Sequence, residues 1–178
     1  MKKYLLLTLK AMVLTGCMTH SSEQRPDVVA ETVQPVHAPQ NTQTLNWEGS
    51  VTPLLAKMLQ TSDSVPGMAL LVDSVKNNTN GSLSVEKVTM AIYDALSNNK
   101  KFMLVPQEKV TVAKQMLGLS ADDSLGLRSK AIGLARYMNA QYMLYSDVSG
   151  DTKRPQLDMQ LIMVQTGELV WSGSGAVK

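Results

Sequence analysis

Two hydrophobic periods organise the chain after residue 46. Apolar side chains recur at helical spacing in four segments, which predicts helices near residues 51–59, 85–96, 110–117 and 131–138. Residues 68–72 form a short continuous apolar run, which is typical of a central strand buried on both faces. Further strands are predicted by apolar runs and by alternation of apolar and polar positions, at residues 102–105, 141–148, 157–164 and 169–172.

The order of these elements predicts an α/β fold in a single domain. Helix, strand, helix, strand, two helices and three strands follow one another. We therefore expect a mixed sheet of about five strands, flanked by about four helices and ending in a C-terminal antiparallel hairpin. Residues 165–168 make the turn of that hairpin, and the asparagine-rich residues 76–81 are interpreted as a turn-rich loop.

Individual residues mark the expected ends and faces of the helices. Pro53 is tolerated only near the first turn of its helix, because proline lacks the backbone N–H. Ser84 is the predicted N-cap of the second helix. Pro106 opens the third helix and Gly118 ends it, and Leu117 is expected on the buried face of that helix.

The amino terminus has the pattern of a secretory signal, with lysines at positions 2 and 3 followed by an apolar stretch. Residues 14–17, Leu-Thr-Gly-Cys, resemble the lipobox of bacterial lipoproteins. The resemblance implies a signal peptide over residues 1–16, cleavage between Gly16 and Cys17, and S-diacylglycerol and N-palmitoyl groups on Cys17. Met18 follows in place of the aspartate that retains lipoproteins in the inner membrane, which favours the periplasmic face of the outer membrane. The alternative is a secreted protein with a chance cysteine.

Residues 17–46 are predicted to be the lipidated cysteine and a flexible tether. The tether holds three prolines, many Gln, Thr and Ser residues, and no helical or strand period. Its 29 residues after Cys17 would reach about 100 Å fully extended, at ~3.3–3.6 Å per residue. As a flexible coil the tether spans about 30 Å. Residues 47–178 are the predicted globular domain.

Composition excludes several classes of function. The chain has 178 residues and a net charge of +2, but three of its 17 basic residues lie in the first ten, which leaves 14 basic against 15 acidic residues. A nucleic-acid binder needs a basic surplus, and none remains. Cys17 is the one cysteine, and both histidines, His20 and His37, precede the predicted domain. We therefore expect no metal site, no cofactor and no small-molecule substrate.

No catalytic residue is assigned. Ser84 and Ser97 each begin a Ser-x-x-Lys sequence like that of penicillin-recognising enzymes, but the Lys-Thr-Gly element of those enzymes is absent. Asp73, Asp122 and Asp123 could act as the two carboxylates of a glycosidase. A carboxylate-dependent periplasmic hydrolase is therefore kept as an alternative function.

The twelve methionines are interpreted as adaptable core filler, with Met58, Met68, Met159 and Met163 at core-facing positions. Two polar, turn-rich segments are candidate contact loops for a partner protein, and the alternative is that both are solvated connections. Their candidate contact residues are Asn77, Asn80, Asp123 and Arg128.

Six blocks of sequence resemble one known family. In order, they are residues 70–75 (LLVDSV), 79–83 (TNGSL), 117–120 (LGLS), 128–133 (RSKAIG), 144–146 (LYS) and 164–168 (VQTGE), the last continuing through residues 171–173 (WSG). Together with the lipobox and the proline-containing tether, these blocks resemble the LpoB family of penicillin-binding protein activators.

The resemblance implies an outer-membrane lipoprotein that regulates peptidoglycan synthesis. It would bind the UvrB-like accessory domain of penicillin-binding protein 1B and stimulate the glycosyltransferase and transpeptidase activities of that enzyme. The family fold is similar to the amino-terminal domain of TolB, and the family offers no catalytic residues. A TolB-like lipoprotein of envelope assembly or secretion, with a different partner, is the main alternative.

Overall fold

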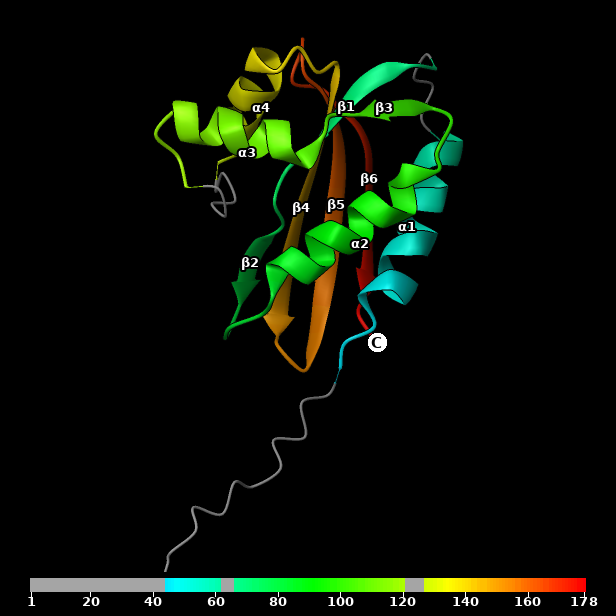
Figure 1. The fold of residues 1–178 in the computed structure, drawn as a ribbon. Coiled ribbons are helices and arrows are strands. Elements are labelled where there is room, and N and C mark those ends of the chain that lie inside the picture. Colours follow the sequence, from blue (N-terminus) through cyan, green and yellow to red (C-terminus); the bar gives the residue numbers. More distant parts are fainter. Residues whose placement is uncertain (1–43, 62–65, 121–126) are drawn as a thin grey trace, which may run out of the picture. The chain divides into compact units, whose positions relative to one another are not determined.

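The computed structural model describes residues 44–61, 66–120 and 127–178, and the fold is given for these residues. The helices are α1 (Trp47–Thr61), α2 (Val85–Ser97), α3 (Gln107–Met116) and α4 (Arg128–Tyr137) (Figure 1). The strands are β1 (Met68–Val72), β2 (Lys76–Thr79), β3 (Phe102–Leu104), β4 (Tyr142–Asp151), β5 (Arg154–Met163) and β6 (Leu169–Ala176). The predicted α/β class and the four helices are confirmed.

The six strands form one mixed sheet. Its order is β3-β1-β4-β5-β6, and β2 also pairs with β4. β1, β2, β3 and β4 are parallel where they pair, whereas β4, β5 and β6 are antiparallel to their neighbours. The parallel strands are joined through helices, as parallel connections require. The predicted C-terminal antiparallel hairpin is confirmed as β5–β6.

β2 is the strand that the sequence did not predict. It occupies residues 76–79, which were expected to be a loop, and pairs with β4 from Lys76↔Asp147 onward. β1 pairs with the same strand as far as Val72↔Leu144. Between these two pairs, residues 73–75 lie opposite residues 145–146, and one extra residue on one strand is the geometry of a β-bulge. Asparagine is a poor strand former, so the pairing is imposed by the free edge of β4.

Helices cover both faces of the sheet. α1 and α2 pack on one face, where Leu70 and Val72 of β1 join a large core cluster. α3 and α4 pack on the other face, where Leu71 joins a second cluster (Figure 1). β1 is thus buried on both faces, as its continuous apolar run predicts.

The start of α1 differs from the expectation for Pro53. The Asn46 side chain caps the helix by accepting a hydrogen bond from the Gly49 N–H at 2.8 Å. The helix therefore begins at Trp47, and Pro53 lies inside it, beyond the first turn. The expected position of Pro53 is wrong because the cap sits further upstream than the apolar spacing indicates. The backbone N–H of Asn46 also donates to the Lys178 carbonyl at 2.7 Å.

The other helix ends agree in part with the sequence. Ser84 occupies the N-cap position of α2, but its side chain makes no capping hydrogen bond. The Pro106 carbonyl accepts hydrogen bonds from the first turn of α3, and Gly118 follows that helix with a φ of +70°. Leu117 is 48% exposed, so its expected burial is wrong. It lies at the C-cap, where the chain has already left the packed face.

Candidate functional site

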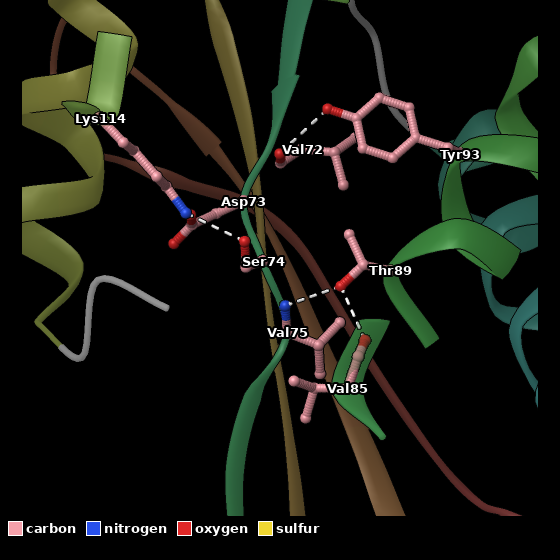
Figure 2. Close-up of polar contacts among 8 residues, drawn as sticks. All are labelled: Val72, Asp73, Ser74, Val75, Val85, Thr89, Tyr93 and Lys114. Atoms are coloured by element: carbon pink, nitrogen blue, oxygen red, sulfur yellow. Dashed lines mark hydrogen bonds and ion pairs between the residues drawn. The ribbon is translucent and has the colours of Figure 1, made fainter. Parts of the chain in front are cut away.

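The junction between β1 and β2 holds a buried ion pair. Asp73, which directly follows β1, is fully buried, and Lys114 of α3 is 1% exposed. The Lys114 Nζ lies 3.3 Å from the Asp73 Oδ1 and donates a hydrogen bond to the Ser74 Oγ at 2.9 Å (Figure 2). The pair therefore links α3 to the bulge between the two strands.

Helix α2 holds the same junction from the opposite face (Figure 2). The Val75 N–H donates to the Thr89 Oγ1 at 3.1 Å, and this hydroxyl donates to the Val85 carbonyl at 2.9 Å. The Tyr93 hydroxyl donates to the Val72 carbonyl at 3.3 Å. Burial raises the pKa of Tyr93 well above its usual range, and the negative charge of Asp73 adds to the effect. These contacts fix the bulge in place.

The carboxyl group at this junction is not placed for glycoside hydrolysis. A glycosidase needs two carboxyl groups across an open cleft, whereas Asp73 is buried beside a lysine. Asp122 and Asp123 lie outside the described residues. Among residues 44–61, 66–120 and 127–178, no group of three His, Cys, Asp or Glu side chains could hold a metal ion. The described helices also include none that is long and apolar enough to span a bilayer.

Beyond α3 and α4, the sheet face on which they pack continues with polar, partly or fully exposed positions. Asp147 of β4 faces Asp158 of β5 across the antiparallel pairing. Burial raises the pKa of Asp147; the hydrogen bond from the Asn78 amide opposes this, and the charge of Asp158 raises it further. We define the polar sheet face by Asn78, Asp147, Ser149, Gln156, Asp158 and Ser174. Sequence reasoning missed it, because polar positions on strands are usual wherever one face meets solvent.

The sequence profile of the peptidoglycan-synthase activator LpoB family matches residues 38–177. The chain belongs to this family. It is 59% identical, over 192 residues covering 100% of both chains, to the penicillin-binding protein activator LpoB of Pectobacterium carotovorum subsp. carotovorum. It is 54% identical, over 99% of both chains, to the activator of the same name from Serratia proteamaculans.

Solved LpoB structures share the fold. The LpoB C-terminal domain from Salmonella enterica is 55% identical and matches with a TM-score of 0.68, covering 75% of this chain and 98% of that one. The NMR structure of Escherichia coli LpoB is 43% identical and matches with a TM-score of 0.67, covering 99% of this chain and 90% of that one. The family resemblance of the six sequence blocks is thereby confirmed.

LpoB-family membership decides the class of function. The chain is an activator of peptidoglycan synthesis whose partner is a penicillin-binding protein, and it is a regulator rather than an enzyme. The carboxylate-dependent hydrolase and the TolB-like lipoprotein with a different kind of partner are both set aside. The family role is consistent with a location in the periplasmic part of the envelope.

The structure places two of the candidate contact residues at one end of the sheet of this LpoB-family domain. Asn77 lies on β2, and its Oδ1 accepts hydrogen bonds from the N–H and the hydroxyl of Thr79, at 3.0 and 2.7 Å. Asn80 follows β2, and its Oδ1 accepts a hydrogen bond from the Thr152 N–H at 3.1 Å. Both side chains are exposed and shape the local turn, so their role in partner contact stays a prediction.

Arg128 lies elsewhere, as the first residue of α4 rather than in a loop. Its Nη2 donates a hydrogen bond to the Gln160 Oε1 on β5. Thr152, next to Asn80, and Gln160 are separated along the β4–β5 hairpin, so the structure does not gather Arg128 and the two asparagines into one cluster. Asp123, Gly16 and Cys17 lie outside the described residues.

Proposed function

We propose that this chain binds and stimulates a bifunctional class A penicillin-binding protein of the 1B type, through the UvrB-like accessory domain of that enzyme. The observation that supports the proposal most strongly is the family match over residues 38–177. The capture experiment at the end of this subsection distinguishes penicillin-binding protein 1B from other class A synthases.

The proposed mechanism is stabilisation of an active conformation of the partner. A protein that contributes no reacting group accelerates an enzyme only by binding its active conformation more tightly than its inactive one. A tenfold preference corresponds to about 1.4 kcal/mol, which a modest interface supplies. Both the glycosyltransferase and the transpeptidase reaction then speed up, because one conformational change serves both.

The proposed anchor supports this mechanism. Residues 1–16 act as the signal peptide, Cys17 carries the lipid, and residues 18–46 connect it to the domain. Each buried methylene of an acyl chain contributes about 0.8 kcal/mol, so several chains make a durable attachment to the outer membrane. A tether also raises the local concentration of the domain near its partner, so the contact itself can be weak.

Mass spectrometry of the mature protein tests the anchor. We expect an amino terminus at Cys17 carrying a diacylglycerol and an N-acyl group, and a Cys17→Ser variant that is absent from outer-membrane fractions. A mature wild-type protein with a free Cys17 thiol would contradict the anchor while leaving the partner proposal standing.

Asn77, Asn80, Asp123 and Arg128 are retained as proposed contact residues. Their test is the affinity of alanine variants for the synthase. If Asp123→Ala and Arg128→Ala bind like the wild type, that segment is eliminated as a contact. The same result for Asn77→Ala and Asn80→Ala eliminates the first segment.

Capture from detergent-solubilised envelopes tests the choice of partner. The full-length chain, immobilised through a C-terminal tag, should retain penicillin-binding protein 1B from wild-type membranes. It should retain little from cells whose 1B lacks the accessory domain, although the enzyme is otherwise intact. Retention of a different class A synthase, in place of 1B, would contradict the proposal.

A further inference from the structure

Exposed apolar side chains gather on two of the four helices. Eight large hydrophobic residues are exposed among the described residues. Five of them belong to α3, α4 or the cap positions of these helices: Val112, Met116, Leu117, Leu127 and Tyr137. Solvated helix faces are normally polar, and contiguous exposed apolar surface on a soluble domain marks an interaction site.

Three of these residues also line a cavity between the two helices. The cavity has a volume of about 300 Å³, and its apolar wall is formed by Val112, Met116, Tyr137 and Met138. The Tyr137 hydroxyl lies 3.9 Å from the Met116 Sδ, so the two helices meet at one side of it. We call this feature the α3–α4 groove.

The α3–α4 groove is not a by-product of core packing. The core-facing side of α3 is already provided by Val110, Ala113 and Lys114, which are buried. Val112 is 47% exposed and Met116 is 72% exposed, so neither contributes a full side chain to the interior. Their exposed apolar surface is therefore available for an external contact.

The groove lies away from the point where the amino-terminal segment joins the domain. Asn46 is hydrogen-bonded to Lys178, and Val177 to Pro155, near the start of β5. Arg136 of α4 instead donates to the Val164 carbonyl, just beyond the end of β5. The ten residues of β5 span about 33 Å at 3.3 Å per residue. Figure 1 shows α3 and α4 at the end of the sheet opposite the C-terminus.

The charges beside the groove favour a protein over a lipid surface. Glu108 and Lys109 both line it, one of each sign. An anionic membrane surface attracts clusters of basic residues, and this pair has no net charge. A concave, apolar, electrically balanced groove fits one large apolar side chain presented by a folded protein domain.

We propose that the α3–α4 groove docks onto the penicillin-binding protein and receives one large aliphatic or aromatic side chain of that enzyme. The inference rests on the proposed function, since the occupant is the synthase that the chain activates. The groove lies at the other end of the sheet from Asn46, where the amino-terminal segment joins the domain.

Two substitutions test the groove, each with a matched control. In the full-length chain, Met116→Glu and Tyr137→Glu should each raise the Kd for penicillin-binding protein 1B at least tenfold, because a carboxylate cannot enter an apolar contact. Met90→Glu on α2 and Met103→Glu on β3 replace methionines that are 56% and 61% exposed elsewhere on the domain. These controls should bind like the wild type, and Met116→Leu should retain affinity.

The outcomes separate the groove from the proposed function. Wild-type chain that neither binds nor stimulates 1B would overturn both. Wild-type stimulation with unchanged binding by Met116→Glu and Tyr137→Glu would overturn the groove alone. If these variants abolish self-association seen in sedimentation, or adsorption to anionic vesicles, and still bind 1B normally, the occupant is a second copy or a membrane and the proposal is wrong.

Discussion

Lys114 is the residue whose environment departs furthest from its chemical type. A lysine that is 1% exposed is tolerated because its ammonium lies beside the Asp73 carboxylate and the Ser74 hydroxyl. Taking both charges out of water costs about as much free energy as their attraction returns, so the pair as a whole adds little stability. Its clearest role is to fix the bulge between β1 and β2, where both side chains meet.

Removing one partner of this pair should be far more harmful than removing both. Lys114→Met leaves Asp73 as a buried uncompensated charge, and we expect the free energy of unfolding to fall by about 3–5 kcal/mol. The double variant Asp73→Asn/Lys114→Met should recover most of that loss. Urea denaturation of the four proteins of this cycle measures the coupling. A loss in the double variant equal to the sum of the losses in the two single variants would show that the two groups do not interact.

The raised pKa of Asp147 makes the stability of the domain depend on pH. The folded state holds the pKa of Asp147 above its ordinary value of 3.8, so its folded form binds a proton more tightly than its unfolded form. Its contribution to stability therefore falls as pH rises from 3.8 through the raised pKa, and is constant above it. Asp158 is one cause of the raised pKa, and burial is the larger one.

Asp158→Asn should accordingly stabilise the domain at neutral pH by roughly 0.2–1 kcal/mol, the usual size of a cross-strand like-charge effect. Well below the raised pKa of Asp147 the gain should vanish, because Asp147 is then protonated and carries no charge for Asp158 to repel. Denaturation curves at neutral pH and at low pH measure this gain in stability. Asp94→Asn, on the exposed side of α2, is the control. A gain of equal size at low pH would rule out charge repulsion as the cause.

At the scale of elements, the C-terminal hairpin depends on how a tryptophan packs on a glycine. A Cβ at Gly173 would lie 2.5 Å from the Trp171 ring, so only glycine fits there without movement. Trp171 itself packs against the core that α1 and α2 cover. At Gly175 a Cβ would lie 3.6 Å from Leu54, an ordinary contact.

Gly173→Ala should therefore lower stability by about 1–3 kcal/mol, the usual cost of overpacking. Gly175→Ala should change it by less than about 0.5 kcal/mol. Thermal unfolding with tryptophan fluorescence distinguishes the two, because displacement of Trp171 shifts its emission. If the two variants unfold at the same temperature and have the same tryptophan emission, the packing of the Trp171 ring does not require glycine at position 173.

Elements with a strong hydrophobic period could be predicted from the sequence. β1, β4, β5 and the buried face of α2 carry their signal in their own side chains. β2 could not be predicted, because Asn77 and Asn78 lack strand propensity and the pairing comes from β4, about 70 residues away in the chain.

The surfaces were less predictable than the elements. The spacing of apolar residues on α3 does not reveal which of them meet solvent, so Met116 and Leu117 gave no signal that they are exposed. Met58 and Met159 are fully buried as expected, whereas Met68 and Met163 are only half-buried and Met90, Met103 and Met116 are exposed. The ion pair at Lys114 was missed because a lysine on a helix is usually solvated.

At the scale of the whole molecule, an activator must meet its partner on a surface that its own attachment leaves free. The described domain begins beside its C-terminus, where Asn46 contacts Lys178, and α4 meets the other end of β5 at Val164. The point where the amino-terminal segment joins the domain and the proposed docking surface thus lie at different ends of the sheet.

The rate of glycan-chain polymerisation by purified penicillin-binding protein 1B, with and without the full-length chain, tests the central claim most directly. We expect the rate to rise with the concentration of the chain and to reach a plateau once the synthase is saturated. The chain alone should neither polymerise the lipid-linked precursor nor release fragments from peptidoglycan. An unchanged rate at concentrations where binding is measured, or turnover by the chain alone, would contradict activation through binding.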